Sequence, residues 1–257
     1  MSGETSIHSY SESGRPEVVT IRIDRPHVRN ALDVNGLNQL AEALEICRHD
    51  PKVRAVIVTG TGDAFCAGAD INILNALSGD ALSAYLENWT ETLVRIITMP
   101  KIVIAAVNGV SSGAGNHMML CSDLCYVSDR ASFHFTGASK GIPSMELGAL
   151  LLPMTIGLKR AKAILLRGGK IEPAQAVELG LCNAVVRHES WQQELDTLAV
   201  EFASRRAETL AHNKYILNQA AFDMIGAVKL STIAGGAYLS SQTTLRTGRM
   251  DTRDDDS

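Results

Sequence analysis

Apolar residues in the first half of the chain form short runs with the composition of β-strands. These runs span residues 18–24, 53–60, 102–109, 123–129 and 131–135. In the first run apolar and polar residues alternate, so Val19, Ile21 and Ile23 would lie on one face of a strand. The second and third runs are almost continuously apolar, a pattern typical of strands covered on both faces. We therefore predict a sheet in the interior of an α/β fold.

Helical patterns occupy the segments between these runs and nearly all of the second half. In the first half they span residues 34–48, 80–98 and 115–122. In the second half, the segment 172–180 has Pro173 near its first helical position and Gly180 at its end, both of which are typical helix boundaries. Strands mixed with helices and followed by helices alone indicate an α/β core with an appended helical region.

The chain divides by composition into four parts. We expect a disordered N-terminus over 1–15, an α/β core over 16–190, a helical region over 191–245 and a polar tail over 246–257. The two end segments are polar, so we predict that they form no packed structure. No linker rich in proline, glycine or serine separates the two middle parts.

Composition and charge disfavour nucleic-acid-binding, membrane-spanning and secreted proteins. The 257 residues are 46% hydrophobic and 20% charged, which is ordinary for a globular protein, and the net charge of -4 gives no reason to expect nucleic-acid binding. No apolar run reaches the roughly 18 residues of a membrane span, and the polar N-terminus lacks the apolar centre of a signal peptide. We therefore expect a cytoplasmic protein without a membrane partner. Its five cysteines have no spacing typical of disulfides or of a metal site, which predicts reduced thiols in the core.

Two loops reduced to very small residues follow predicted strands. One contains Ala67-Gly68-Ala69, and the other contains Ser111 to Gly115 and leads into a predicted helix. Small residues allow left-handed backbone angles and close packing, which is the structural interpretation. They also expose main-chain N–H groups. Two such donors on one oxygen stabilise an enolate or tetrahedral oxyanion, and each is worth about 3–4 kcal/mol in known cases.

Five segments together point to a known family. The segments 25–32, 63–71, 100–115, 121–133 and 170–186 resemble, in order and spacing, the enoyl-CoA hydratase/isomerase or crotonase superfamily. The resemblance extends over about residues 15 to 245. It implies a crotonase-like spiral of ββα units with a C-terminal helical trimerisation region, and a homotrimer or a dimer of trimers. It also implies an acyl-CoA substrate, with coenzyme A as part of the substrate and no tightly bound cofactor or metal.

The resemblance also implies the roles of particular residues. The oxyanion donors would be the main-chain N–H groups of Ala69 and Ala114. The residues expected beside the coenzyme A part of the substrate are Val28, Arg29, Ala31, Ala67 and Ile71. Asp70 follows the first donor loop, and we interpret it as a hydrogen-bond acceptor that fixes this loop on the substrate side.

The sequence departs from the family at both acid/base positions. Hydratases of this family use two glutamates, and the corresponding positions are His117 and Gly137. His117 is one replacement, since histidine exchanges protons near neutral pH, although a packed histidine is the alternative. Glu146 is another: it lies one residue from the working aspartate of dehalogenase-like and dienoyl-CoA isomerase members, and an exposed loop glutamate is its alternative.

A third replacement uses no side-chain carboxylate. Thr136 and Gly137 resemble a segment of dihydroxynaphthoyl-CoA synthases in which bound bicarbonate takes the place of the missing carboxylate, although Phe135 replaces a glutamine of that segment. This predicts a bicarbonate-like anion near Gly137. We expect His134 to be a packed histidine rather than a catalyst, and we expect Tyr85 and Trp89 to pack against the core rather than to line an acyl pocket.

We therefore expect an enzyme that acts on an acyl-CoA thioester through a stabilised enolate. Because both glutamates are replaced, we favour isomerisation, carbon–carbon lysis or hydrolysis, or decarboxylation over plain hydration. Hydration by altered residues and hydrolysis of the thioester remain open. A catalytically inactive CoA-binding or partner subunit is a different class of hypothesis, and the loss of both glutamates is what it predicts. The intact 25–32 segment disfavours a carbon–carbon hydrolase that does not use CoA.

Overall fold

The computed structural model describes residues 5–11, 14–144 and 147–241, and its core contains two sheets. The larger sheet has the order β1 (Ser6–Ser11), β2 (Val18–Asp24), β3 (Ala55–Gly60), β5 (Ile102–Val107), β7 (Leu124–Ser128) and β10 (Ala184–Val186). Only β1 is antiparallel to its neighbour. The smaller sheet has the order β4 (Ala64–Cys66), β6 (Val110–Ser112), β8 (Ser132–Phe135) and β9 (Gly169–Ile171), with β9 antiparallel to β8.

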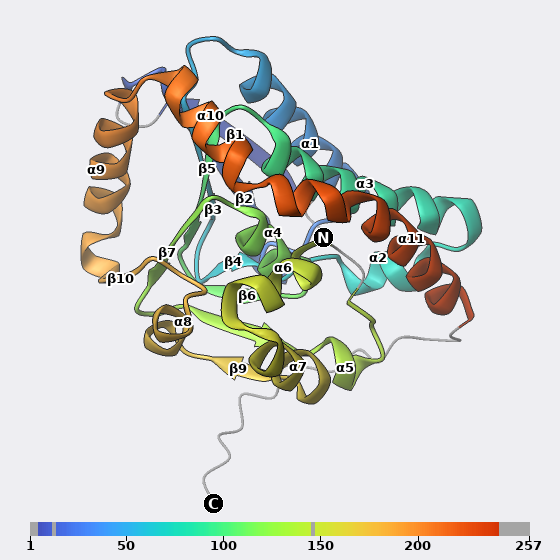
Figure 1. The fold of residues 1–257 in the computed structure, drawn as a ribbon. Helices are drawn as coiled ribbons and strands as arrows, with labels where there is room; N and C mark the ends of the chain where they lie inside the picture. Colours follow the sequence, from blue (N-terminus) through green and yellow to red (C-terminus); the bar gives the residue numbers. More distant parts are fainter. Residues whose placement is uncertain (1–4, 12–13, 145–146, 242–257) are drawn as a thin grey trace, which may run out of the picture.

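The chain repeats one unit around these sheets. A strand of the larger sheet is followed by a strand of the smaller sheet and then by helix, as in β3–β4, β5–β6 and β7–β8 (Figure 1). The helices that follow are α2 (Ile71–Ala76), α3 (Gly79–Thr98), α4 (Ala114–Cys121), α5 (Gly137–Lys140), α6 (Leu147–Ile156) and α7 (Leu158–Arg167). The predicted spiral of ββα units is thus confirmed.

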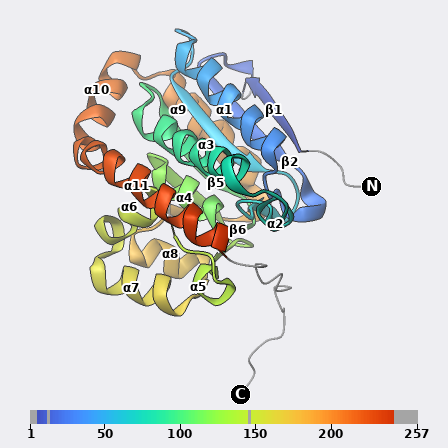
Figure 2. The same ribbon diagram turned by 90° about the vertical axis from the view of Figure 1, so that its right-hand side faces the viewer.

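The remaining helices cover the sheets. They are α1 (Val34–His49), α8 (Pro173–Leu179), α9 (Trp191–Ala203), α10 (Ala207–Leu217) and α11 (Gln219–Ser241). Leu195, Leu198 and Phe202 of α9 pack on one face of the larger sheet, while α1, α3 and α4 pack against the other. Both views show α11 lying along α3 (Figures 1 and 2). The interior strands are therefore covered on both faces, as their apolar composition indicated.

One sequence expectation needs correction. We expected residues 1–15 to be disordered, yet Ser6–Ser11 form β1, which pairs with β2 along its whole length. Ile7 packs on the core, and its N–H donates to the side chain of Gln39 at 3.1 Å. An edge strand draws much of its stability from main-chain pairing and can carry exposed polar side chains. The polar composition of this segment therefore did not indicate a strand. The predicted tail, 246–257, lies outside the described residues.

Lys214 attaches α10 to the core. Its ammonium donates to the carbonyls of Ile96 and Lys101 at 2.6 and 2.8 Å and pairs with the Asp123 carboxylate at 2.7 Å. Asp123 in turn accepts from the Val103 N–H at 2.8 Å. Burial lowers the pKa of Lys214, although Asp123 opposes this shift. The helical region and the α/β core are therefore joined by a buried polar network.

The five cysteines are all buried free thiols, which confirms that prediction. Over the described residues, no helix combines the length and apolar character needed to cross a bilayer.

Candidate active site

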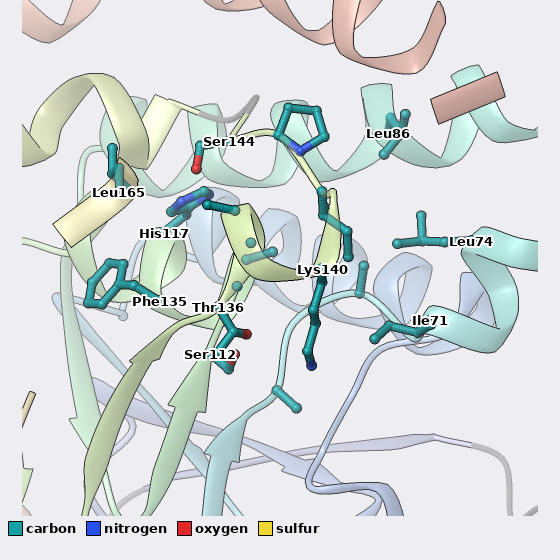
Figure 3. Close-up of a pocket in the computed structure, with 18 residues that line it drawn as sticks. Ile71, Leu74, Leu86, Ser112, His117, Phe135, Thr136, Lys140, Ser144 and Leu165 are labelled. Carbon is teal, nitrogen blue, oxygen red and sulfur yellow. The ribbon is translucent and has the colours of Figure 1, made fainter. Parts of the chain in front are cut away.

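A cavity of about 110 Å³ lies between the ends of the β4 and β6 strands and the segment 135–144 (Figure 3). Its volume is well above the roughly 10–15 Å³ that one water molecule needs. Seven predicted site residues line it: Ala67, Ala69, Ile71, Ala114, His117, Thr136 and Gly137. The cavity therefore brings together residues that are 70 positions apart in sequence.

The first small-residue loop, 67–70, pairs with the segment 29–32. The Leu32 N–H donates to the Gly68 carbonyl at 2.8 Å, and the Asp70 N–H donates to the Leu32 carbonyl at 3.1 Å. This is a parallel bridge between Leu32 and Ala69. In such a bridge the N–H of Ala69 itself points away from Leu32. Ala69 also lines the cavity, and its N–H takes no part in the bridge.

Hydrogen bonds from polar side chains stabilise this pairing between the segments 29–32 and 67–70. Arg25 donates to the Asp70 carboxylate at 2.6 Å, and Asp70 accepts from the Asn72 N–H at 2.9 Å, so Asp70 does fix the loop by accepting hydrogen bonds. Asn30 donates to the Ala64 carbonyl at 2.8 Å. The Tyr85 hydroxyl donates to the Leu32 carbonyl at 2.6 Å. Burial raises the pKa of Tyr85, so its hydroxyl remains a donor. The segment 25–32 thus holds the loop in place.

The second loop meets the first in van der Waals contact. A Cβ on Gly68 would lie 2.7 Å from the Ala114 nitrogen, and one on Gly115 would lie 2.1 Å from the Cys66 carbonyl oxygen. Gly68 and Gly113 have φ of 89° and 53°, which L side chains rarely adopt. Only glycine therefore permits both the backbone angles and this approach.

Ala114 is the first residue of α4, so its N–H has no acceptor within the helix. Within the described part of the chain, neither this N–H nor that of Ala69 donates a hydrogen bond. Two residues of adjoining loops whose N–H groups are not used within the described chain, Ala69 and Ala114, consequently line one cavity. Burial raises the pKa of the neighbouring Cys66 to about 12, which disfavours a thiolate nucleophile at this point.

His117 lies one helical turn after Ala114 and is buried at the cavity wall. Figure 3 shows its ring on the side of the cavity where Ser144 and Leu165 lie. Helix α6 packs directly on it, since a Cβ on Gly148 would lie 2.5 Å from the His117 Cα. His117 is therefore held in place by backbone packing while its side chain faces the cavity.

The strand β8 separates two kinds of side chain. Phe135 faces the cavity, whereas His134 points to the opposite face, where the Ser132 hydroxyl lies 2.9 Å from its Nε2. Burial and the charges of Lys170 and Arg29 lower the pKa of His134. The expectation that His134 packs is confirmed. Tyr85 and Trp89 also pack, since both are buried in the core.

The remaining predicted residues lie elsewhere. Val28, Arg29, Ala31 and Asp70 do not line the cavity, although Ala67 donates to the Arg29 carbonyl at 2.9 Å, which places this segment beside it. Glu146 lies outside the described residues.

Sequence reasoning missed two kinds of contribution. Arg25 supports the loop through the Asp70 carboxylate, and Asn30 and Tyr85 support it through main-chain carbonyls; no local pattern shows these contacts. Lys140 lines the cavity, and the available signal was that it is the only lysine or arginine between 134 and 144.

Comparisons with known proteins agree with this geometry. A family model described as enoyl-CoA hydratase/isomerase matches residues 14–240. A 1,2-epoxyphenylacetyl-CoA isomerase of Escherichia coli (strain K12) is 34% identical over 218 residues, covering 83% of this chain and 82% of that protein. A mitochondrial enoyl-CoA hydratase of Pongo abelii is 32% identical over 224 residues, covering 86% of this chain and 73% of that protein.

A solved structure extends the agreement to three dimensions. The crystal structure of an enoyl-CoA hydratase/isomerase from Mycobacterium paratuberculosis matches with a TM-score of 0.84 at 26% identity, covering 93% of this chain and 95% of that one. The fold, the two adjoining loops and these relatives lead to one conclusion: the chain belongs to the enoyl-CoA hydratase/isomerase family, whose members are enzymes acting on acyl-CoA thioesters.

Proposed function

We propose that the protein forms an enolate from an acyl-CoA thioester, with the thioester oxygen bound between the N–H groups of Ala69 and Ala114. The observation that carries this proposal is that both donors border one cavity and have no acceptor among the described residues. When a proton leaves the α-carbon, its electron pair moves to the thioester oxygen, and two fixed donors stabilise the charge that develops there.

His117 is the proposed proton carrier. Its side chain lines the same cavity as the two donors, and histidine can accept and return a proton near neutral pH. Glu146 stays a prediction. Thr136 and Gly137 both line the cavity, which supports a bicarbonate-like anion as the other candidate in this role.

We favour isomerisation or carbon–carbon bond chemistry over hydration. His117 replaces one expected glutamate and Gly137 the other, and hydration by the family mechanism needs both carboxylates. The E. coli relative is named an isomerase, which supports this class. Hydration by altered residues is the alternative, supported by the name of the mitochondrial relative. An inactive CoA-binding subunit is the second alternative.

We also propose that coenzyme A passes along the segment 28–31 and that the protein forms a trimer or a dimer of trimers. The first is supported by the hydrogen bond between this segment and Ala67. The second is supported by large apolar side chains left exposed on α10 and α11, namely Tyr215, Ile216, Leu217, Leu230 and Ile233.

Exchange of the α-protons with solvent tests the enolate directly. Butyryl-CoA, phenylacetyl-CoA and glutaryl-CoA are incubated with the protein in D₂O, and deuterium at the α-carbon is measured by mass spectrometry. We expect exchange into at least one thioester. Binding of these thioesters without any exchange would instead support the inactive subunit. Loss of absorbance from crotonyl-CoA, measured in parallel, would identify a hydratase.

A further inference from the structure

Lys140 is the one cationic side chain that lines the cavity within the described residues. It lies at the end of α5 and is about half-buried. Figure 3 shows its side chain crossing toward the part of the cavity where Ile71 and Ser112 lie, away from His117. Its charge therefore borders the site.

A buried lysine, Lys214, shows what a structural role looks like in this chain. The ammonium of Lys214 has two carbonyl acceptors and the carboxylate of Asp123. Across residues 5–11, 14–144 and 147–241, the ammonium of Lys140 has neither a hydrogen-bond acceptor nor an ion-pair partner. Burying a cation is unfavourable unless it is paired. Among the described residues the fold supplies partners for the charge of Lys214 and none for that of Lys140, which leaves Lys140 available to an anion in the cavity.

The surroundings of Lys140 add positive charge. Burial lowers the pKa of Lys140, and the nearby guanidinium of Arg29 lowers it further. Lys170 and Glu172, which do not line the cavity, pair with each other at 2.7 Å and so contribute little net charge. Arg29 and Lys140 together make this side of the cavity attractive to an anion.

We propose that Lys140 binds an anionic oxygen group of the substrate, either a carboxylate on the acyl part or a phosphate of the coenzyme A part. This proposal rests on the proposed function, because it takes the cavity to be the acyl-CoA site. A carboxylate or phosphate would supply the charged partner that Lys140 lacks, through a charge-assisted hydrogen bond. Lys140 is then a specificity residue, while the two amides and His117 act on the thioester itself.

Dissociation constants of saturated thioesters test this without requiring turnover. Butyryl-CoA and glutaryl-CoA, and the same two acyl groups on pantetheine, are titrated into the wild type and Lys140→Met. If Lys140 binds the acyl carboxylate, Lys140→Met raises the dissociation constants of both glutaryl thioesters by about tenfold or more and leaves those of the butyryl thioesters unchanged. If Lys140 binds a phosphate, Lys140→Met raises the dissociation constants of both CoA thioesters equally and leaves those of both pantetheine thioesters unchanged.

Two further variants make the result specific. Lys140→Arg keeps the charge and should keep most of the affinity. Lys170→Met removes a nearby charge from outside the cavity and should change every dissociation constant by less than about twofold, since exposed pairs are screened. The proposal is wrong if Lys140→Met binds all four thioesters as the wild type does, or if Lys170→Met has the same effect. Deuterium exchange fails or succeeds independently of these constants, so the two proposals can be told apart.

Discussion

The two sides of the cavity are built from different chemical groups. On one side, the loops 67–70 and 112–115 contribute main-chain N–H groups held by a bridge, an Arg25–Asp70 ion pair and glycine contacts. On the other side, α4 and the segment 135–144 contribute the side chains of His117 and Lys140. We call these the amide side and the side-chain side.

The difference separates what is general in the site from what is particular to this chain. Main-chain donors do not depend on residue identity, so the amide side keeps one function as long as its glycines and anchors remain. In the two proposals, the side-chain side determines where protons go and which substrate is bound, so a single substitution there would change either. The amide side therefore indicates the family, whereas we propose that the side-chain side determines the reaction.

The largest expected effect comes from a substitution that disturbs the contact between the two loops of the amide side. Gly68→Ala would place a Cβ 2.7 Å from the Ala114 nitrogen and 2.9 Å from the Ser112 carbonyl oxygen. We expect the rate of α-proton exchange to fall by about 10²–10³-fold or more, the cost of losing one oxyanion donor. Exchange kinetics at saturating thioester measure this.

Gly79 offers the matched control for backbone strain. It also has a positive φ, 54°, but a Cβ there meets nothing within 4 Å. Gly79→Ala should lower the stability by roughly 1–2 kcal/mol and leave exchange unchanged. If both variants exchange at the wild-type rate, the amides of Ala69 and Ala114 are not the oxyanion donors.

The next effect tests proton transfer on the side-chain side. His117→Ala should reduce exchange by about 10²–10⁴-fold, the usual contribution of a general acid or base. Thioester affinity should change little, because the amide side is intact. His134→Gln serves as the control, since His134 lies on the opposite face of β8. If His117→Ala exchanges the α-proton at the wild-type rate, another group and not His117 carries the proton.

The smallest effect concerns pH. Burial, reinforced by Lys170 and Arg29, lowers the pKa of His134 in the folded protein. The unfolded chain then binds more protons than the folded one below about pH 6.5, so this residue makes stability fall as pH decreases from there. His134→Gln should flatten the decline of the melting temperature between pH 7 and pH 5. An equally steep decline in the variant would show that His134 contributes nothing to it.

The amide side and most of the fold could be predicted from sequence because their signals are local. The alternation in 18–24 gave β2 with its observed bounds, and Gly180 ends α8 with a left-handed residue as expected. Gly68 and Gly113 identified loops that only glycine can form. β1 was missed because an edge strand needs main-chain pairing and not an apolar run.

The side-chain side could be predicted only in part, because it depends on how distant segments meet. His117 was found through its place after the second loop. Lys140 was not, since a lysine in a polar loop looks like any exposed charge until the cavity wall is known. Tyr85 and Asn30 were missed for the same reason. They donate to the main-chain carbonyls of Leu32 and Ala64, and any residue type carries such a carbonyl.

The network around Lys214 bears on how this chain can be shortened. Removing everything from α10 onward would take away the cation that faces Asp123 and would leave that carboxylate enclosed, with the Val103 N–H as its remaining main-chain donor. Asp123 immediately precedes β7, which lies between β5 and β10 in the larger sheet. The C-terminal helices are thus not a detachable accessory, because without them an uncompensated charge would be buried where the core is assembled.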